Sequence, residues 1–563
     1  MGSLKSEIRT AITHALYGAV DATRTALGFP VETEMPEFVV SSPREEKFGD
    51  FSTNVAMQLA KPTRRPPREV AAVILEHFDY QRCSWVEKAE IAGPGFINFY
   101  LRAGWLNEAL RQIILAGEGY GRSTIGGKQQ VNVEFVSANP TGLLHMGNAR
   151  GAALGDSIAA LLSYCGFSVS REFYINDTGH QIDRLAASLE ARYLQEFGED
   201  ALVPEDGYQG TDVADTARRF IALTGEAYRH AAGPERLKAL IDFGVADKIA
   251  AIRESLECFG VRYDVWFSEG DLHASGAVEK VVADLVEAGA TYEFEGALWF
   301  KAGQYGADKD EVLIRSSGAA TYFAADIAYH VDKLRRGFTW LINVWGADHH
   351  GHVARLKAGL KALGYDPDCL QVVIMQLVRL FRGGEAVRMS KRTGEVVTLG
   401  ELLEEVGRDA ARYFFVLRGA DSHLDFDLDL ARAQSMENPV YYVQYAHARI
   451  ASLFRQLALR NKELPAINSA KLELLSTEEE ERLIKKLADF PEEVVDAAID
   501  LAPHRLTGYV YELAGLFHSF YNVHRVIGAE PGLEEARLVL VQATGMVLRR
   551  ALALLGISAP EKM

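Results

Sequence analysis

Two segments of the chain carry residue types suited to binding phosphate. His145, Gly147 and Asn148 follow an alternating apolar run at 131–135 and a turn at 139–142, and they open a helix rich in small residues. The start of a helix offers unpaired N–H groups and the positive end of the helix dipole, and both favour phosphate. His145 and Asn148 are three residues apart, so both side chains can face one ligand. This segment predicts a nucleotide site.

The second segment, at 388–399, reads RMSKRTGEVVTL. Arg388, Lys391 and Arg392 place three cations on a loop near several glycines, an arrangement suited to closing over a triphosphate. A short basic stretch is usually solvated surface when it stands alone. Its occurrence downstream of the His145 segment favours a shared phosphate site.

A third polar cluster comprises Asp348, His349, His350 and His352, directly after the apolar run at 339–346. Imidazoles and a carboxylate can bind zinc, but a zinc site also needs partners at the right geometry. Packing within a turn is the plain alternative for each histidine. We expect no tightly bound protein metal.

The elements that must position these residues predict an α/β protein. Strands alternate with helices from about 131 to 430, which favours a Rossmann-like parallel sheet with its ligands at the carboxyl ends of the strands. Before it lies a small α+β unit, and after it the spacing becomes almost wholly helical. We expect domains at 1–115, at 120–435 with an insertion at about 186–310, and at 436–563, the last a bundle with helices near 440–459, 477–501, 505–526 and 532–555.

Composition narrows the class of partner and the compartment. The formal net charge of −17 argues against indiscriminate polyanion binding and leaves recognition to local basic patches. No apolar stretch reaches the roughly 18 residues of a membrane span, so no membrane partner is expected. The 4 cysteines have no CxxC spacing. We expect a cytoplasmic, monomeric protein.

The two phosphate segments resemble the HIGH and KMSK signatures of class I aminoacyl-tRNA synthetases. The resemblance then narrows: EFVSANPTGLLHMGNARGAALGD, YINDTGHQID, GAATYFAADIAYHVDK, WGADHHGH and the terminal LRRALALLGISAPEKM look like bacterial-type arginyl-tRNA synthetase, in the family's order and over nearly the full chain. Two positions depart from the signatures, since Arg388 replaces the first lysine of KMSK and Asn148 the last histidine of HIGH.

This resemblance implies ATP-dependent charging of tRNA(Arg) with L-arginine, with Mg²⁺ arriving on ATP. His145, Asn148, Lys391 and Arg388 are the catalytic positions that it implies. The expected ATP-binding positions are His145, Gly147, Asn148, Asp348, His352, Met389, Ser390 and Lys391.

The arginine pocket implied by the resemblance consists of Glu134, Ser137, Asn139, Tyr322 and Asp326. The residue types agree with that substrate, because a guanidinium is a planar fork of donors that needs fixed carboxylates and oxygen acceptors. Tyr322 and Asp326 are four residues apart, which puts them on one face of a helix. A surface carboxylate or a packed tyrosine is the alternative at each position.

Both ends of the chain are expected to bind tRNA. Phe96 and Asn98 alternate on one strand face, where a ring could stack on a base and an amide could contact a base edge. Tyr445 and Arg449 lie four apart on a helix of the bundle, and the family's carboxyl terminus, here Met563, also contacts the anticodon loop. Core packing is the alternative for each aromatic residue.

Two other functions remain open from the sequence. One is another class I synthetase or a nucleotidyltransferase, although the acidic pair Glu134 and Asp326 favours a cationic amino acid. The other is a catalytically silent tRNA-binding paralogue, which would have no physical need to keep His145, Gly147 and Lys391.

Overall fold

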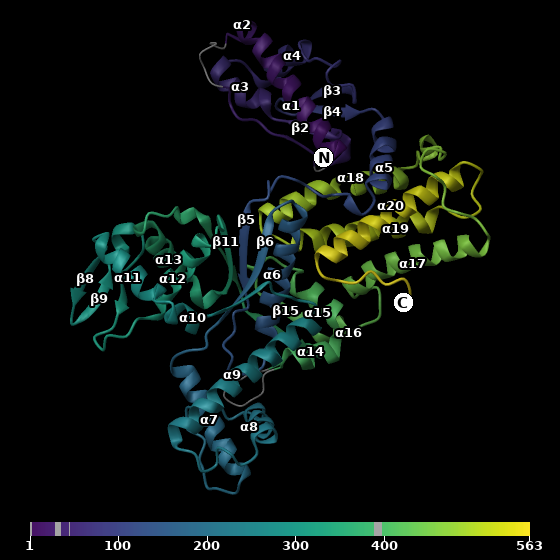
Figure 1. The fold of residues 1–563 in the computed structure, drawn as a ribbon. Helices are drawn as coiled ribbons and strands as arrows, with labels where there is room; N and C mark the ends of the chain where they lie inside the picture. The colour runs from purple at the N-terminus through teal and green to yellow at the C-terminus, as the bar shows by residue number, and fades with distance from the viewer. Residues whose placement is uncertain (1–2, 29–34, 44, 388–396) are drawn as a thin grey trace.

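The computed structural model describes residues 3–28, 35–43, 45–387 and 397–563 (Figure 1). They form an α+β unit, a central α/β region and a C-terminal helical bundle, which confirms the predicted fold class. Within the described part of the chain, no helix is long and apolar enough to cross a membrane.

The N-terminal unit packs helices on an antiparallel sheet of order β1-β2-β4-β3. Its first helix buries Leu4, Ile8, Ile12 and Leu16, a stripe at helical spacing that faces this sheet's core. The elements are α1 (Leu4–Ala22), α2 (Arg24–Leu27), β1 (Val40–Ser41), β2 (Phe51–Thr53), α3 (Val55–Thr63), α4 (Pro67–Glu76), β3 (Val86–Ala92), β4 (Phe96–Leu101) and the connecting α5 (Gly104–Ala116).

A five-stranded parallel sheet of order β12-β11-β5-β6-β7 organises the central region. Its strands are β5 (Gln130–Phe135), β6 (Ser168–Ile175), β7 (Val265–Ser268), β11 (Trp340–Gly346) and β12 (Leu370–Met375). Helix α6 (Met146–Tyr164) follows β5 and packs closely on it, because Gly155 has no side chain: a Cβ there would lie 2.2 Å from Phe135 Cγ. The opposite face of β5 carries the buried Asn132 and Glu134, and Glu134 contacts Lys333 of α12 (Tyr322–Arg335).

Two groups of elements are inserted beside this sheet. Helices α7 (His180–Glu196), α8 (Thr211–Thr224) and α9 (Gly233–Cys258) lie between β6 and β7, have their own apolar core and project away from the sheet (Figure 1). Between β7 and α12 lie α10 (Glu269–Ala274), α11 (Ala277–Glu287) and the antiparallel strands β8 (Thr291–Phe294), β9 (Ala297–Phe300) and β10 (Glu311–Ile314).

The chain after β11 returns to the sheet and then leads to the bundle. Its elements are α13 (His350–Ala362), β13 (Val378–Arg382), β14 (Glu385–Ala386), α14 (Leu399–Val406), α15 (Arg408–Phe415), β15 (Leu424–Asp427) and α16 (Leu428–Arg432). Short 3-10 helices occur at Glu46–Phe48, Gly117–Gly119, Ala302–Tyr305, Ala347–His349, Pro367–Cys369 and Leu472–Leu474.

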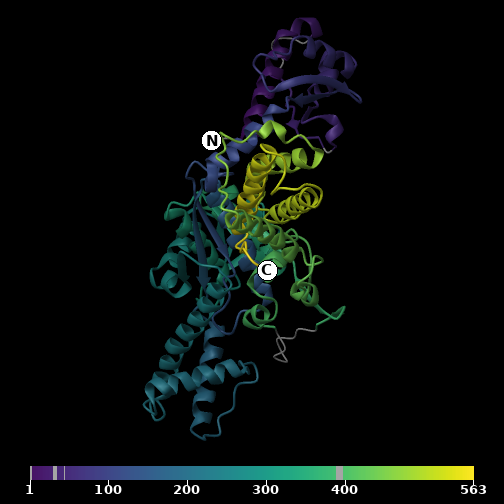
Figure 2. The same ribbon diagram turned by 90° about the vertical axis from the view of Figure 1, so that its right-hand side faces the viewer.

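The C-terminal bundle consists of α17 (Pro439–Leu459), α18 (Glu478–Ile499), α19 (His504–Val523) and α20 (Leu533–Leu554), which confirms the four helices expected there. Figure 2 shows these helices between the N-terminal unit and the central region. Helices α18 and α20 pack on α6, and the ion pairs Lys5–Asp489 and Arg9–Glu492 join α1 to α18.

Candidate active site

The carboxyl ends of the parallel strands bring together polar residues that are far apart in the sequence. Ser137 follows β5, Glu269 follows β7, and Asp348 and His352 follow β11. Parallel strands end at the same edge of a sheet, which is where α/β proteins bind ligands. The first turn of α6 opens at this edge.

His145 is the N-cap residue of α6 and forms a capping box with Asn148. Its Nδ1 accepts the backbone N–H of Gly147 at 3.2 Å, and Asn148 Oδ1 accepts the backbone N–H of His145 at 3.1 Å. Because Nδ1 accepts a hydrogen bond, the neutral imidazole carries its proton on Nε2. A Cβ at Gly147 would lie 3.1 Å from His145 Cε1, so a side chain there would press on the imidazole. The capping box therefore holds the ring at the helix N-terminus.

The end of the second phosphate segment lies against this turn. Thr398 forms an isolated antiparallel bridge with His145, and the Leu399 N–H donates to the Leu144 carbonyl at 2.8 Å. Arg388, Met389, Ser390 and Lys391 lie outside the described residues. The described chain on the C-terminal side of that segment thus returns to the His145 turn, more than 240 residues away in sequence.

Arg150 anchors α6 to the chain that follows β12. Its buried guanidinium donates to the carbonyl oxygens of Gln376 at 2.7 Å, Gly419 at 2.9 Å and Ser422 at 3.0 Å. Burial lowers the pKa of Arg150 to about 10, so the group still carries its charge at neutral pH. The start of α6 is therefore held from two sides.

One face of α12 supplies four polar side chains: Tyr322, Asp326, His330 and Lys333. Asp326 Oδ2 and His352 Nε2 lie 2.8 Å apart. The sequence predicted these two residues for different substrates, arginine and ATP, and the structure places them in contact. The Tyr322 side chain is 49 % exposed, so packing in the core is not its role.

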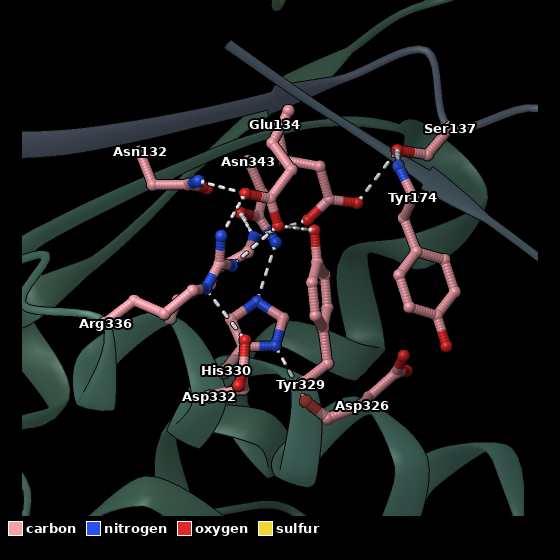
Figure 3. A network of polar contacts seen from close by, with 12 residues as sticks. Asn132, Glu134, Ser137, Tyr174, Asp326, Tyr329, His330, Asp332, Arg336 and Asn343 are labelled. Carbon is pink, nitrogen blue, oxygen red and sulfur yellow. Dashed lines mark hydrogen bonds and ion pairs between the residues drawn. The ribbon is translucent and has the colours of Figure 1, made fainter. Parts of the chain in front are cut away.

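Glu134 lies beneath this face in a buried polar network. Its Oε2 accepts from Lys333 Nζ at 2.6 Å, and its Oε1 accepts from Ser137 Oγ at 3.0 Å. Figure 3 shows Glu134 of β5 with Ser137 from the turn after β5, Asn343 of β11 and His330 of α12. The alternative of a surface carboxylate is wrong for Glu134, since only 6 % of the residue is exposed.

The turn after β5 is strained. Val136 and Ser137 have φ values of 69° and 38°, and a β-branched residue rarely adopts such a conformation. Backbone strain of this kind clusters at functional sites, where surrounding contacts hold it. Here Ser137 Oγ donates to Glu134 and accepts the Tyr174 N–H at 3.1 Å, so the strained turn joins β5 to β6.

Glu269 is a buried carboxylate that the sequence prediction missed. Its pKa lies above the ordinary value, mainly because of burial, and the nearby negative charge of Asp326 adds to the rise. Tyr174 contacts it, and the Tyr174 hydroxyl points toward Asp326 in Figure 3. Asp177 holds the neighbouring backbone, since it accepts from Ser268 Oγ at 2.6 Å and from the Gly270 N–H at 2.8 Å. The sequence signal for Glu269 is its place directly after a short strand.

The remaining predicted positions at this edge make ordinary polar contacts. Asn139 Nδ2 donates to Gln181 Oε1 at 2.7 Å, and Asp348 pairs with His349 at 3.5 Å. Among residues 3–28, 35–43, 45–387 and 397–563, no group of three or more His, Cys, Asp or Glu side chains is arranged to hold a metal ion.

The predicted tRNA-binding residues differ in accessibility. Phe96 is 38 % exposed on β4, whereas Asn98 is buried and its Oδ1 accepts from Ser52 Oγ at 2.8 Å. In the bundle, the Arg449 guanidinium lies 5.3 Å from the centroid of the Tyr445 ring. Met563 is exposed at the end of the chain. Phe96, Tyr445, Arg449 and Met563 are therefore at least partly accessible, and Asn98 is not.

Three family models match successive parts of the chain. Residues 4–101 match "Arginyl tRNA synthetase N terminal domain", residues 109–416 match "tRNA synthetases class I (R), catalytic domain", and residues 443–563 match "DALR anticodon binding domain". The central model covers more than half of the chain, including the α6 turn and the α12 face.

Full-length relatives agree with these models. The chain is 61 % identical to the arginine–tRNA ligase of Desulforudis audaxviator over 564 residues, covering 100 % of both chains, and 56 % identical to that of Moorella thermoacetica over 561 residues, again covering 100 % of both. Its fold is similar to the solved structure of Thermus thermophilus arginyl-tRNA synthetase, with a TM-score of 0.75, 28 % identity, and coverage of 99 % of this chain and 100 % of that one. The protein therefore belongs to the arginyl-tRNA synthetase family.

Proposed function

We propose that this protein is an arginine–tRNA ligase that activates L-arginine with ATP and transfers the arginyl group to the 3′ end of tRNA(Arg). The observation that carries the assignment is one sheet edge that joins a helix N-terminus suited to phosphate to a set of buried and half-buried carboxylates suited to a cation. AMP and pyrophosphate are the other products. The matched family and the sequence identity support the same activity.

The arginine site uses Glu134, Asp326 and Glu269 as its negative charges, with Tyr322, Ser137 and Asn139 as further polar contacts. A guanidinium presents five N–H donors in one plane, and carboxylates fixed by their neighbours match that geometry. The contacts of Asp326 with His352 and of Glu134 with Ser137 support fixed positions. A neutral or acidic amino acid would offer Asp326 and Glu269 no cation and would lack the planar set of N–H donors.

The ATP site uses His145, Gly147 and Asn148 at the start of α6, with Asp348 and His352 beside it. ATP enters as its Mg²⁺ complex. An oxygen of the arginine carboxylate attacks the α-phosphorus and the bond to pyrophosphate breaks, so no strong base is needed. His145 and Asn148 bind the phosphates. Arg388, Met389, Ser390 and Lys391 complete the set of ATP-binding residues, and the cations among them stabilise the leaving pyrophosphate.

The transfer step needs tRNA contacts at both ends of the molecule. A hydroxyl of the terminal ribose attacks the arginyl carbonyl carbon, and AMP leaves. Within domains at 1–115, 120–435 and 436–563, Phe96 binds the tRNA elbow, while Tyr445, Arg449 and Met563 bind the anticodon loop. Asn98 is buried on an inner strand and supports Phe96 by holding β4 to β2 through its hydrogen bond with Ser52. We propose a cytoplasmic monomer.

Pyrophosphate exchange tests this function. Arginine-dependent exchange of labelled pyrophosphate into ATP is expected to be weak for the protein alone and strong when tRNA(Arg) is added, as the family resemblance implies. Lysine serves as the control substrate, because it has the same charge without the planar fork of donors. Absence of exchange under both conditions would refute the ligase assignment, and equal exchange with lysine would refute the guanidinium pocket.

The raised pKa of Glu269 predicts a pH effect on arginine binding. As pH falls through this raised pKa, Glu269 takes up a proton and loses the charge that attracts the guanidinium. As the pH is lowered, the arginine KM is therefore expected to begin rising at a higher pH than it would if Glu269 had the pKa of an ordinary glutamate. In Glu269→Gln, the KM should be high throughout and should lose this pH dependence. Steady-state exchange between about pH 5 and 8 measures it; an unchanged profile in the variant would exclude Glu269 from the pocket.

A further inference from the structure

Lys333 forms a fully buried ion pair with Glu134. Its Nζ lies 2.6 Å from Glu134 Oε2, and the exposed fractions of the two side chains are 0 % and 8 %. Burying two charges costs several kcal/mol unless the geometry and further hydrogen bonds repay it. A buried pair beside a substrate pocket therefore needs a reason beyond stability.

The other contacts of Lys333 hold its ammonium in one position. Its Nζ donates to Asn343 Oδ1 at 3.3 Å and lies 4.2 Å from the centroid of the Tyr329 ring. Because the Lys333 side chain has no exposed surface, surrounding atoms prevent it from moving toward a ligand. The cation is thus a fixed part of the protein beside Glu134.

A directed chain of hydrogen bonds extends from this pair to Asp326 (Figure 3). Burial and the nearby Lys333 charge keep the pKa of His330 well below its ordinary value, so the ring is neutral. His330 Nδ1 lies 2.7 Å from the Asp326 carbonyl oxygen and must donate to it. Its Nε2 then accepts from Asn343 Nδ2 at 2.8 Å, which turns Asn343 Oδ1 toward Lys333. The chain therefore links the Glu134–Lys333 pair to the backbone of Asp326.

A second buried carboxylate nearby has its own cation. Glu172 accepts from both terminal nitrogens of Arg336 at 2.8 Å, and also from Tyr329 and Asn132. Lys333 makes its short hydrogen bond to Glu134. Each of the two buried carboxylates therefore has its own cation, Lys333 for Glu134 and Arg336 for Glu172.

We propose that Lys333 is a positioning residue for arginine recognition, which pairs with Glu134 and keeps its carboxylate aimed at the substrate. The proposal rests on the assignment of Glu134 to the arginine site. Without the ammonium, the Glu134 carboxylate would lose the 2.6 Å hydrogen bond that fixes one of its two oxygens and would keep only the contact with Ser137. Lys333 contacts Glu134 and does not need to touch arginine.

Variants of Lys333, Lys248 and Glu134 test this role in tRNA-dependent exchange, with the KM for arginine, the KM for ATP and kcat measured for each. Lys333→Met removes the charge and the hydrogen bonds, and is expected to raise the arginine KM about tenfold while the ATP KM and kcat change by less than about threefold. Lys333→Gln keeps a donor and is expected to restore part of the arginine KM. Lys248→Met is the matched control, because Lys248 is equally buried and paired with Asp212 in the α7–α9 insertion; its arginine KM should be unchanged.

Glu134→Gln separates failure of this proposal from failure of the site assignment. If Glu134→Gln leaves the arginine KM unchanged, Glu134 is not in the arginine site. If Glu134→Gln raises it and Lys333→Met does not, the role of Lys333 is refuted. The proposal would also be refuted if Lys333→Met raised both KM values and lowered kcat by similar factors and Lys333→Gln restored none of them. That result would show a structural role for Lys333. Should Lys333→Met fail to fold, Lys333→Gln compared with Lys248→Gln decides the same question.

Discussion

Asp326→Asn is expected to raise the KM for arginine about 100-fold, equivalent to roughly 3 kcal/mol, while the KM for ATP changes by less than about threefold. The substitution keeps the shape of the side chain and removes its charge. Asp326 lies on the α12 face near Tyr322 with a partly exposed side chain, which agrees with its proposed role in binding the arginine side chain. Exchange at varied arginine and at varied ATP measures the two constants separately.

The contact between Asp326 and His352 makes this experiment discriminating. His352 is proposed for the ATP site, so a large and equal change in both KM values would place Asp326 between the substrates and not on the arginine side. Asp332→Asn provides the matched control. Asp332 lies on the same helix, its side chain has the same 33 % exposure, and it pairs with Arg336 at 2.8 Å. The arginine KM of this control should stay close to that of the unmodified protein.

His145→Ala is expected to lower kcat by about 100- to 1,000-fold, because a donor fixed at the helix N-terminus stabilises charge that develops during phosphoryl transfer. The same substitution removes an N-cap acceptor, which costs roughly 1 kcal/mol of stability. Single-turnover formation of arginyl-adenylate in the presence of tRNA measures the chemical step. Thermal unfolding measures the loss of the cap.

His145→Asn separates the two roles of this residue. Asparagine is among the best N-cap residues, so the melting temperature should be close to that of the unmodified protein. Its amide lacks the reach and the donor position of the imidazole, and kcat should fall nearly as far as in His145→Ala. If His145→Asn kept full activity, His145 would serve only as a cap, and phosphate stabilisation would have to come from elsewhere.

The sequence by itself determined the fold class and the nucleotide turn. The small residues after Gly147 and the alternation at 131–135 are local patterns, and local patterns predict a strand, a turn and a helix without knowledge of the rest of the chain. The four bundle helices were also predicted from the sequence, because their apolar residues recur at helical spacing over about 20 residues each. Crossover rules then placed the ligand edge at the carboxyl ends of the strands.

Burial was the first property that the sequence did not determine. Phe96 and Asn98 lie on the same face of β4, yet Phe96 is exposed and Asn98 is buried against Ser52. Strand periodicity places side chains on one face or the other, but whether a neighbouring strand covers a given position depends on sheet order and register. Glu134 is a second case. The alternation of residues along β5 predicts on which face of the strand Glu134 lies, and only the tertiary structure shows that α12 covers this face.

The pairing of side chains was the second property that the sequence did not determine. It sets the contacts of the carboxylates at the proposed arginine site. Lys333 lies 199 residues from Glu134, and His352 lies 26 residues from Asp326. Glu269 comes near Tyr174 and Asp326 only through the pairing of β6 with β7 in the sheet. Each pairing rests on through-space distances between elements that a linear pattern does not encode. The sequence therefore determined which residue types were available at the sheet edge, and the tertiary structure decided which partner each carboxylate meets, Lys333 for Glu134 and His352 for Asp326.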